Sequence, residues 1–452
     1  MASSTDTIFA RSDAANNLGT SVKLEHNHIT GPKPFQPFYF PSYTLNTGTQ
    51  DLDIEERPSL GFAFVLGCQH FLAMFGLGTL LFFAVTGGRV PSYLGASAAF
   101  IQPVLTVTRF SGSFGDLNPN VGIAQGGIFV TGLVYAAIAV LVILFGSKYV
   151  KILMPPLVSG AVVMAIGLNL AGIGVSNAAS SQDAPWQAAI TILFIGAFSS
   201  FGPSFTKQIP ILLGLLLSYI IAVIAGKVTG REINYKSLDE ASWFSAPRFT
   251  VPIFEGHAIV TILPAVIVLL AENMGHVATI GSITNRNLDG YLGRAFLGDA
   301  AATCLSALGG GAGVTTYAEN IGTMAVTRVY STFIFPIAAI LAIILSFFQK
   351  FGGVLRTIPN GIWGGIEIVV FGLIAITGAR IWLQNRVDLS DPKNLFIAAV
   401  VVILGSGMPS LPGGVLHLGD GFQLDGIGLS AITAIVLNFA VFVVPALFER
   451  KS

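Results

Sequence analysis

The chain has 452 residues, zero formal net charge, 53% hydrophobic and only 10% charged residues, and a mean hydropathy of +0.75. Soluble domains carry about 25% charged residues, so this composition excludes a soluble globular protein. Zero net charge gives no reason to expect nucleic-acid binding. Repeated long apolar runs predict a polytopic, all-α membrane protein, because a β-barrel would show short alternating segments instead.

The N-terminal part, residues 1–58, is polar and has no basic start followed by an apolar core, so it does not resemble a signal peptide. We predict a largely disordered tail there. About thirteen apolar segments follow, at approximately 60–86, 92–108, 121–146, 152–175, 186–203, 207–227, 257–278, 295–311, 314–328, 330–349, 357–382, 393–411 and 427–448. The polar segment 228–256 divides them into two halves, 59–227 and 257–449.

The two halves show related patterns. MPPLVSG (154–160) and IPNGIWG (358–364) each open an apolar segment with Pro and then Gly. VPSYLGASAAFIQP (90–103) and GAGVTTYAENIGTM (311–324) are both apolar segments interrupted by Gly or Pro, in corresponding places. Broken helices expose backbone groups that lipid cannot satisfy, so such a pair indicates the binding site of a transporter.

The first half is shorter than the second by about one membrane helix. Lys and Arg lie in segments 148–151, 286–294, 380–393 and 450–451, whereas 176–185 and 412–426 have none. The positive-inside rule places the basic segments and the C-terminus in the cytoplasm. A single span at 60–86 would then leave the N-terminal tail on the outer side.

Two groups in the seventh segment point to chemistry within the membrane. Glu272 and His276 are four residues apart, on one face of a helix. A carboxylate within a span costs roughly 2.5–3.5 kcal/mol to insert, so Glu272 is a candidate functional residue, and His276 suggests a proton-linked pair. The alternative is that Glu272 only caps the helix before Arg286.

The second broken segment carries Glu319 next to Asn320, for which a structural ion pair with Arg328 is the alternative. Gln69 and His70 are polar residues within the first segment, and a hydrogen bond between helices would explain them equally well. Phe100 would normally be core packing, but its place in the first broken segment makes a role toward a flat ligand possible.

These residues resemble the nucleobase–ascorbate transporter family. Glu-Asn-Ile-Gly at 319–322, followed by Thr327 and Arg328, matches the family signature, and TTYAENIG with Glu at its head is similar to the uracil and pyrimidine branch. Further similar stretches follow in the same order as in that branch: GCQHFLAMFG, GGRVPSYLGASAAF, LMPPLVSGAVVMAIGLNL, AENMGH and FGLIAITGARIWLQNRVDLS. The resemblance covers residues 58–450.

The resemblance implies fourteen segments in two inverted repeats of seven, of which about thirteen are present here. It implies a core domain that holds the substrate, a gate domain that forms a homodimer, and broken segments that each contribute a short strand and a half-helix. Glu272 and Glu319 would bind the nucleobase, aided by the segments around Ala99, Phe100, Ala318 and Tyr317 and by backbone N–H groups of Phe100 and Ala318. His276 and Glu272 would carry the coupling proton, supported by the following residues: Gln69, His70, Asn320, Thr327 and Arg328. No cofactor or metal is implied.

One departure from the family lies between FLAMFG (71–76) and LGTLLFF (77–83), where about one helix of chain is absent and two spans are fused. A segment of this length as one helix is about 40 Å, enough for one tilted span across a hydrocarbon core of about 30 Å but not for two. We therefore expect the chain to be poorly folded or inactive as written, and we expect that inserting a family-typical helical hairpin between Gly76 and Leu77 restores uptake.

The expected function is proton-coupled symport of uracil or a related pyrimidine across the plasma membrane by alternating access. A purine carrier for xanthine or uric acid, an ascorbate carrier, and an inactive splice or gene-model variant are the alternatives within the family. An anion carrier of the same repeat plan would have a basic residue at the substrate position. A membrane enzyme is disfavoured because the chain shows no metal-ligand cluster or nucleophile–base pair, and a channel because paired broken helices indicate alternating access.

Overall fold

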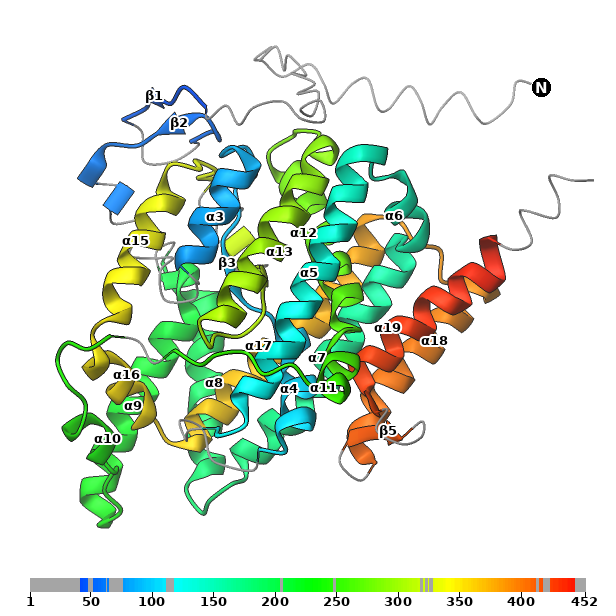
Figure 1. Cartoon of the computed structure of the whole chain (residues 1–452). Coiled ribbons are helices and arrows are strands. Elements are labelled where there is room, and N and C mark those ends of the chain that lie inside the picture. Colours follow the sequence, from blue (N-terminus) through cyan, green and yellow to red (C-terminus); the bar gives the residue numbers. More distant parts are fainter. Residues whose placement is uncertain are drawn as a thin grey trace, which may run out of the picture.

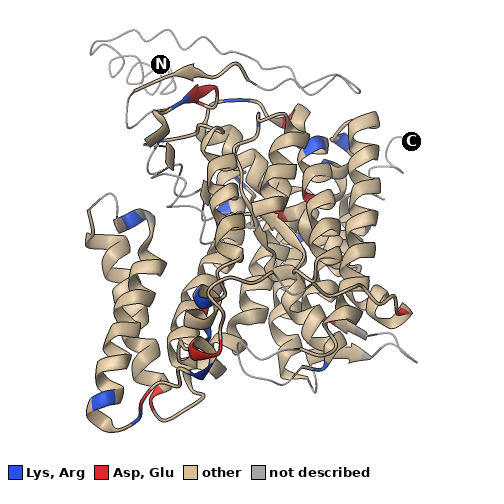
Figure 2. Cartoon of the chain, turned by 60° about the vertical axis from the view of Figure 1, so that its left-hand side comes forward, with Lys and Arg blue, Asp and Glu red and all other residues tan. Residues whose placement is uncertain are grey.

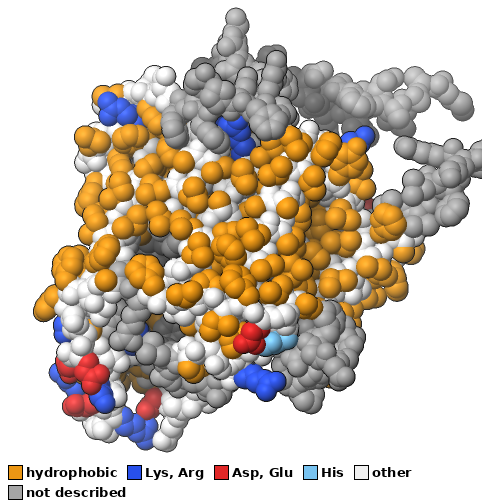
Figure 3. All heavy atoms as spheres, in the orientation of Figure 1, with side chains coloured by type: hydrophobic (Ala, Val, Ile, Leu, Met, Phe, Trp, Pro, Cys, Tyr) orange, Lys and Arg blue, Asp and Glu red, His pale blue; other side chains and the backbone are white. Residues whose placement is uncertain are grey.

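The computed structural model describes residues 41–47, 52–61, 63–64, 76–110, 118–203, 206–246, 249–317, 320–321, 324, 328–411, 414–417 and 423–443. Seven helices in this part of the chain are long and apolar enough to cross a membrane. An eighth span results if α15 (Ile334–Ser346) and α16 (Gln349–Arg356), which meet at 81°, are counted as one. Hydrophobic side chains form a broad band across the visible face (Figure 3), and charged residues gather mainly at the two ends of the helices (Figure 2). The prediction of a polytopic α-helical membrane protein is confirmed.

The first half of the chain contains short strands followed by mostly long helices (Figure 1). Its elements are β1 (Thr44–Leu45), β2 (Glu56–Arg57), α3 (Gly76–Thr86), β3 (Leu94–Ala96), α4 (Ile101–Thr108), α5 (Val121–Phe145), α6 (Lys148–Leu153), α7 (Pro156–Ala178), α8 (Ala184–Phe201), α9 (Pro210–Thr229) and α10 (Lys236–Asp239). A 3-10 turn, Ala98–Phe100, joins β3 to α4.

The second half of the chain begins at α11. Its elements are α11 (Gly256–Ile262), α12 (Ala265–Ile283), α13 (Leu292–Leu308), β4 (Val314–Thr316), α15 (Ile334–Ser346), α16 (Gln349–Arg356), α17 (Asn360–Gln384), α18 (Pro392–Gly407), β5 (Val415–His417), β6 (Gln423–Asp425) and α19 (Gly426–Asn438), which continues as a π-helical turn over Phe439–Val443.

The helices pack as two bodies. The core domain consists of α3, α5, α12, α13 and α15 with the two broken segments, and the gate domain consists of α7, α8, α9, α17, α18 and α19. In the gate domain, α7 and α17 approach closely because Gly160, Gly167 and Gly174 lie seven residues apart on the facing side of α7. A Cβ on Gly167 would lie 2.4 Å from the Phe371 carbonyl oxygen, so only glycine permits this contact.

The two broken segments meet within the core domain. β3 and β4 pair antiparallel, with Leu94 opposite Thr316 and Ala96 opposite Val314. The predicted short strand in each broken segment is confirmed. A threonine from the preceding helix completes each strand: the Leu94 N–H donates to Thr79 Oγ1 on α3 (3.0 Å), and the Val314 N–H donates to Thr303 Oγ1 on α13 (3.3 Å).

Segment 60–86 does not form a single span. Its two ends lie together, because Glu55 pairs with Arg89 and the Thr332 hydroxyl lies within hydrogen-bond distance of both the Ile54 and Gly88 carbonyl oxygens. The chain therefore enters and leaves this segment at the same end of the molecule, which we call the β1–β2 end. The described part of this segment ends in α3, which runs from Gly76 to Thr86 and packs against α13 and α15.

The described end of the predicted N-terminal tail, residues 52–57, does not lie at the end of the molecule opposite the basic segments. Residues 52–57 lie at the same end as the basic segment 286–294, since Asp53 pairs with Arg286. Residues 41–47 and 52–58 also belong to the folded body, with the Leu52 and Ile54 side chains fully buried, so the predicted disordered tail does not extend to residue 58. The reason is that this polar stretch finds backbone and charge partners at the β1–β2 end that a tail on the other side would lack.

Candidate functional site

Helix α12 carries the two residues that the sequence singled out, and it connects them to both broken segments. The Ser97 hydroxyl, directly after β3, donates to Glu272 Oε2 at 3.3 Å. The His276 Nδ1 atom lies 2.7 Å from Thr316 Oγ1 in β4. Because Glu272 and His276 are one turn apart, one face of α12 contacts the ends of both β3 and β4.

A cavity of about 90 Å³ lies beside this face of α12. Its walls come from both domains: α12 and Ile321 on the core side, and α7 and α17 on the gate side. The lining residues are Val163, Glu272, Gly275, His276, Thr279, Ile283, Ile321, Thr377, Arg380, Ile381 and Gln384. A cavity between two packed domains, with polar groups on an otherwise apolar wall, is a typical small-molecule site.

The first broken segment presents small residues and a capped turn near Glu272. Ser97 caps the 3-10 turn by accepting from the Ala99 N–H at 3.2 Å, and its own N–H donates to the Gly313 carbonyl oxygen at 2.9 Å. Ala99 is fully buried. The N–H of Phe100, expected as a ligand donor, donates to the Ser97 carbonyl oxygen at 3.3 Å, and its ring packs on Gly313, where a Cβ would lie 2.2 Å away.

The second broken segment is described in part. The Tyr317 hydroxyl donates to the Ala96 carbonyl oxygen at 2.8 Å, which joins this segment to the end of β3. Asn320 is buried, and its Nδ2 has no hydrogen-bond acceptor among the described residues. Arg328 adopts a left-handed conformation (φ 55°) and its N–H donates to the Met324 carbonyl oxygen at 2.8 Å. Five predicted residues lie outside the described part of the chain: Gln69, His70, Ala318, Glu319 and Thr327.

Sequence reasoning missed a buried polar cluster behind α12. Asp299 on α13 is fully buried, and its Oδ2 accepts from Asn273 Nδ2 at 3.1 Å and from the Tyr135 hydroxyl at 3.3 Å. Asn273 follows Glu272 directly, so this cluster fixes the rotation of α12 about its axis. Applied to segment 295–311, the rule that an intramembrane carboxylate is a functional candidate would have found Asp299.

Ser97 and Thr316 were missed as well. Ser97 follows a strand and precedes a helix, where a serine is a typical N-cap, so its position was readable from the sequence. The contact between Thr316 and His276 carried no such signal, because it depends on how α12 packs against β4. Among the described residues, no group of three or more His, Cys, Asp or Glu side chains is placed to hold a metal ion.

The fold and the site define a multi-pass membrane transporter. The same architecture occurs in the transmembrane domain of a cyanobacterial bicarbonate transporter, BicA (TM-score 0.51, 16% identity, covering 82% of this chain and 92% of that one). It also occurs in the murine anion transporter Slc26a9 in its inward-facing state (TM-score 0.58, 10% identity, 85% and 68% covered). At these identities the likeness shows the fold alone, that of two inverted repeats of seven segments.

The chain belongs to the permease family whose model, Xan_ur_permease, matches residues 68–414. It is 45% identical over 440 residues to "Putative pyrimidine permease RutG" of Escherichia coli (strain K12), with 92% of this chain and 96% of that protein covered. It is 35% identical over 422 residues to the uracil permease of Bacillus caldolyticus, with 86% and 94% covered. Membership confirms the family resemblance and identifies the chain as a transporter and not an enzyme.

Proposed function

We propose that the protein binds uracil or a closely related pyrimidine between its core and gate domains and carries it across the membrane with a proton, by alternating access. The observation that carries this proposal is the placement of Glu272 and His276, each bonded to a different broken segment, beside a cavity walled by both domains. The uracil and pyrimidine permeases among its relatives support the substrate class.

The chemistry of uracil fits these groups. Uracil is flat and neutral, with two ring N–H donors and two carbonyl acceptors. The Ser97 hydroxyl donates to Glu272 Oε2. A carboxylate has about four lone-pair sites, so Glu272 can also accept from a ring N–H. Glu319, and the backbone N–H groups of the broken segments, would serve the remaining donor and acceptors, which leaves no buried polar group unpaired.

Proton coupling would use the same helix. His276 lines the cavity with Glu272, so substrate and proton could occupy neighbouring positions. No cofactor is required, since the proton is the coupling ion. We further propose a plasma-membrane location, a homodimer formed through the gate domain, and cytoplasmic exposure of both the C-terminus and the β1–β2 end, where the basic segments 148–151 and 286–294 meet through the Lys151–Asp289 ion pair.

The test is initial-rate uptake of radiolabelled uracil into proteoliposomes with an imposed proton gradient, with and without a protonophore. Binding is measured in parallel by calorimetry on the purified protein, so that loss of transport and loss of the site can be separated. Thymine, xanthine and uric acid serve as competitors. Proton-independent uptake would contradict the coupling, and displacement by purines but not by pyrimidines would overturn the substrate class.

A further inference from the structure

The part of the N-terminal region that the structure describes makes a compact set of contacts at the β1–β2 end. Residues 41–47 and 52–57, which we call the N-terminal clamp, contain the parallel pair β1–β2. The clamp also lies along residues 329–332: the Tyr330 N–H donates to the Leu52 carbonyl oxygen (2.8 Å), and the Thr332 N–H donates to the Ile54 carbonyl oxygen (3.3 Å). This segment ends the second broken segment, so the clamp holds its final residues.

The acidic residues of the clamp hold two arginines. Arg286 NH2 lies 2.6 Å from Asp53 Oδ2, and its NH1 lies 3.5 Å from Glu55 Oε1. The same Glu55 oxygen pairs with Arg89. Arg286, with its side chain only 14% exposed, follows the end of α12 by three residues, and Arg89 lies shortly before β3. One carboxylate therefore links the helix that carries Glu272 to the first broken segment.

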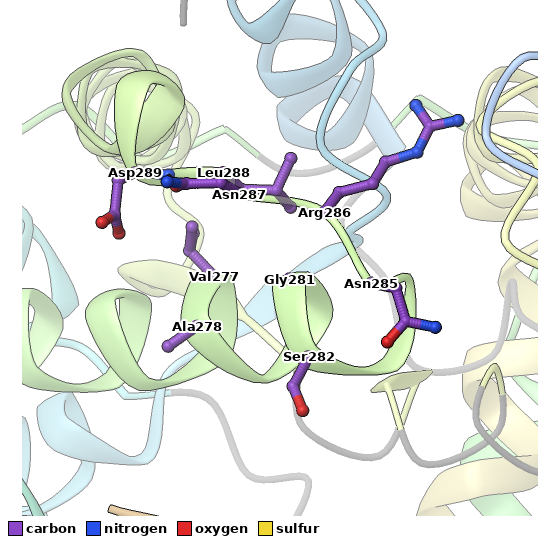
Figure 4. A pocket seen from close by; sticks show the side chains of 9 residues that line it. All are labelled: Val277, Ala278, Gly281, Ser282, Asn285, Arg286, Asn287, Leu288 and Asp289. Carbon is purple, nitrogen blue, oxygen red and sulfur yellow. The ribbon is translucent and has the colours of Figure 1, made fainter. Parts of the chain in front are cut away.

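Figure 4 shows where Arg286 lies in the loop that follows α12. A pocket of about 410 Å³ lies between the last turns of α12 and residues 285–289, and the Arg286 side chain points away from it. Asp289, at the other end of this loop, pairs instead with Lys151 at 2.7 Å. The loop is thus held from two sides, and only the Arg286 side connects to the broken segments.

Thr332 completes the clamp. Its hydroxyl lies 2.8 Å from the Gly88 carbonyl oxygen, 3.2 Å from the Ile54 carbonyl oxygen and 2.7 Å from the Tyr43 hydroxyl. A threonine hydroxyl has a single proton, which one of the carbonyls accepts, so the Tyr43 hydroxyl must donate to Thr332. The Thr332 side chain therefore joins three parts of the chain: its own segment after the second broken segment, Gly88 before β3, and the clamp.

We propose that the N-terminal clamp positions the binding site: by holding Arg89, Arg286 and Thr332, it fixes the ends of the three segments that supply Ser97, Glu272 with His276, and Asn320. Asp53 and Glu55 act as positioning residues, because they contact the ends of these segments and not the cavity. The inference rests on the proposed site but not on uracil as its ligand.

The experiment compares hydrogen exchange in the purified chain with that of Asp53→Asn, Arg286→Gln and the double variant. Losing a charge-assisted bond to a mostly buried arginine should speed exchange of peptides covering 94–108 and 265–283 by about fivefold. The double variant should exchange no faster than Arg286→Gln alone, because Arg286→Gln already removes the contact to Asp53 together with the longer one to Glu55. Lys151→Gln is the matched control, since it breaks an ion pair to the same loop without touching the clamp, and it should leave these peptides within about twofold.

Calorimetry with uracil then separates positioning from general stability. We expect the dissociation constant of Asp53→Asn to rise about fivefold while its melting temperature stays close to that of Lys151→Gln. Faster exchange with unchanged affinity, or unchanged exchange in both peptides, would overturn the proposal. If the unmodified chain binds no pyrimidine, the proposed function fails, and the exchange comparison still decides whether the clamp fixes these segments. Glu55→Gln repeats the test if Arg286→Gln does not fold.

Discussion

The second repeat begins with a 28-residue apolar span, Gly256–Ile283, followed by the 17-residue α13, whereas the first repeat has only residues 59–86 for the same two positions. Despite this difference, the contacts toward the site match. Thr303 on α13 completes β4 at Val314, and Thr79 on the 11-residue α3 completes β3 at Leu94. Each threonine also donates to the carbonyl oxygen of the residue whose N–H it accepts from, Val314 for Thr303 and Leu94 for Thr79.

The comparison shows which part of the opening hairpin the site needs. In both repeats the helix before the strand supplies the threonine that supports it, and in the first repeat Thr79 comes from the described part of α3, Gly76–Thr86. Among the described residues of these helices, the titratable groups lie in the second repeat, with Glu272 and His276 on α12 and Asp299 on α13. The described part of the first repeat contributes backbone, Ser97 and packing to the site.

Restoring the missing length should have the largest effect. Inserting a family-typical helical hairpin between Gly76 and Leu77 should raise proton-dependent uracil uptake above that of the unmodified chain, because two full spans would then brace the first broken segment from both membrane surfaces. Uptake into proteoliposomes measures it, with a soluble Gly/Ser insert of equal length as the control. Robust accumulation by the unmodified 452-residue chain would show that the shortened repeat is sufficient.

Removing the carboxylate of the second repeat should have the next largest effect. Glu272→Gln replaces an acceptor by an amide with donors of its own, and losing a hydrogen bond to a charged group costs about 1.5–3 kcal/mol, or roughly 10- to 150-fold in affinity. Glu367→Gln is the matched control, since Glu367 lies in α17 and bonds Asn177, away from the cavity. Equal affinities for the two variants by calorimetry would argue that Glu272 is structural.

Replacing the histidine should separate coupling from binding. His276→Ala removes the contact to Thr316 but leaves Glu272 in place, so we expect uracil binding to weaken less than accumulation against a gradient. The measurement is exchange of labelled for unlabelled uracil, compared with uphill uptake, in the hairpin-extended chain if the unmodified one is inactive. Thr316→Val removes the hydrogen-bond partner of His276 and leaves the imidazole in place. If exchange and uphill uptake were lost to the same degree, His276 would not have a role in coupling that is separate from binding.

The smallest effect tests the symmetry itself. Thr79→Val leaves the Leu94 N–H without its acceptor, and Thr303→Val does the same to the Val314 N–H. Each change should lower the free energy of unfolding by about 1–3 kcal/mol. We expect similar losses of thermal stability from the two variants, measured by unfolding in detergent. A much smaller loss for Thr79→Val would mean that β3 is loosely held and that the contacts in the two repeats are not equivalent.

Much of this protein could be predicted from the amino-acid sequence because its determinants are local. The apolar runs, the paired Gly- and Pro-interrupted segments, and the spacing of Glu272 and His276 follow from hydropathy and helical period. Asp299 was equally readable but lies in a run that was treated as apolar. The polar segment 52–58 shows no apolar periodicity, so nothing local indicated that it would be ordered.

Tertiary structure alone decided which end of the molecule the N-terminal segment occupies and which side chains meet. The sequence determined that residues 60–86 are long enough for one span, but length does not say whether a chain crosses or returns. Arg286 is more than 200 residues from Asp53 and Glu55 in the sequence, and their pairing depends on where α12 ends relative to β1 and β2. Contacts of Ser97 with Glu272 and of Thr316 with His276 likewise exist only because antiparallel pairing of β3 and β4 brings two halves of the chain against one face of α12.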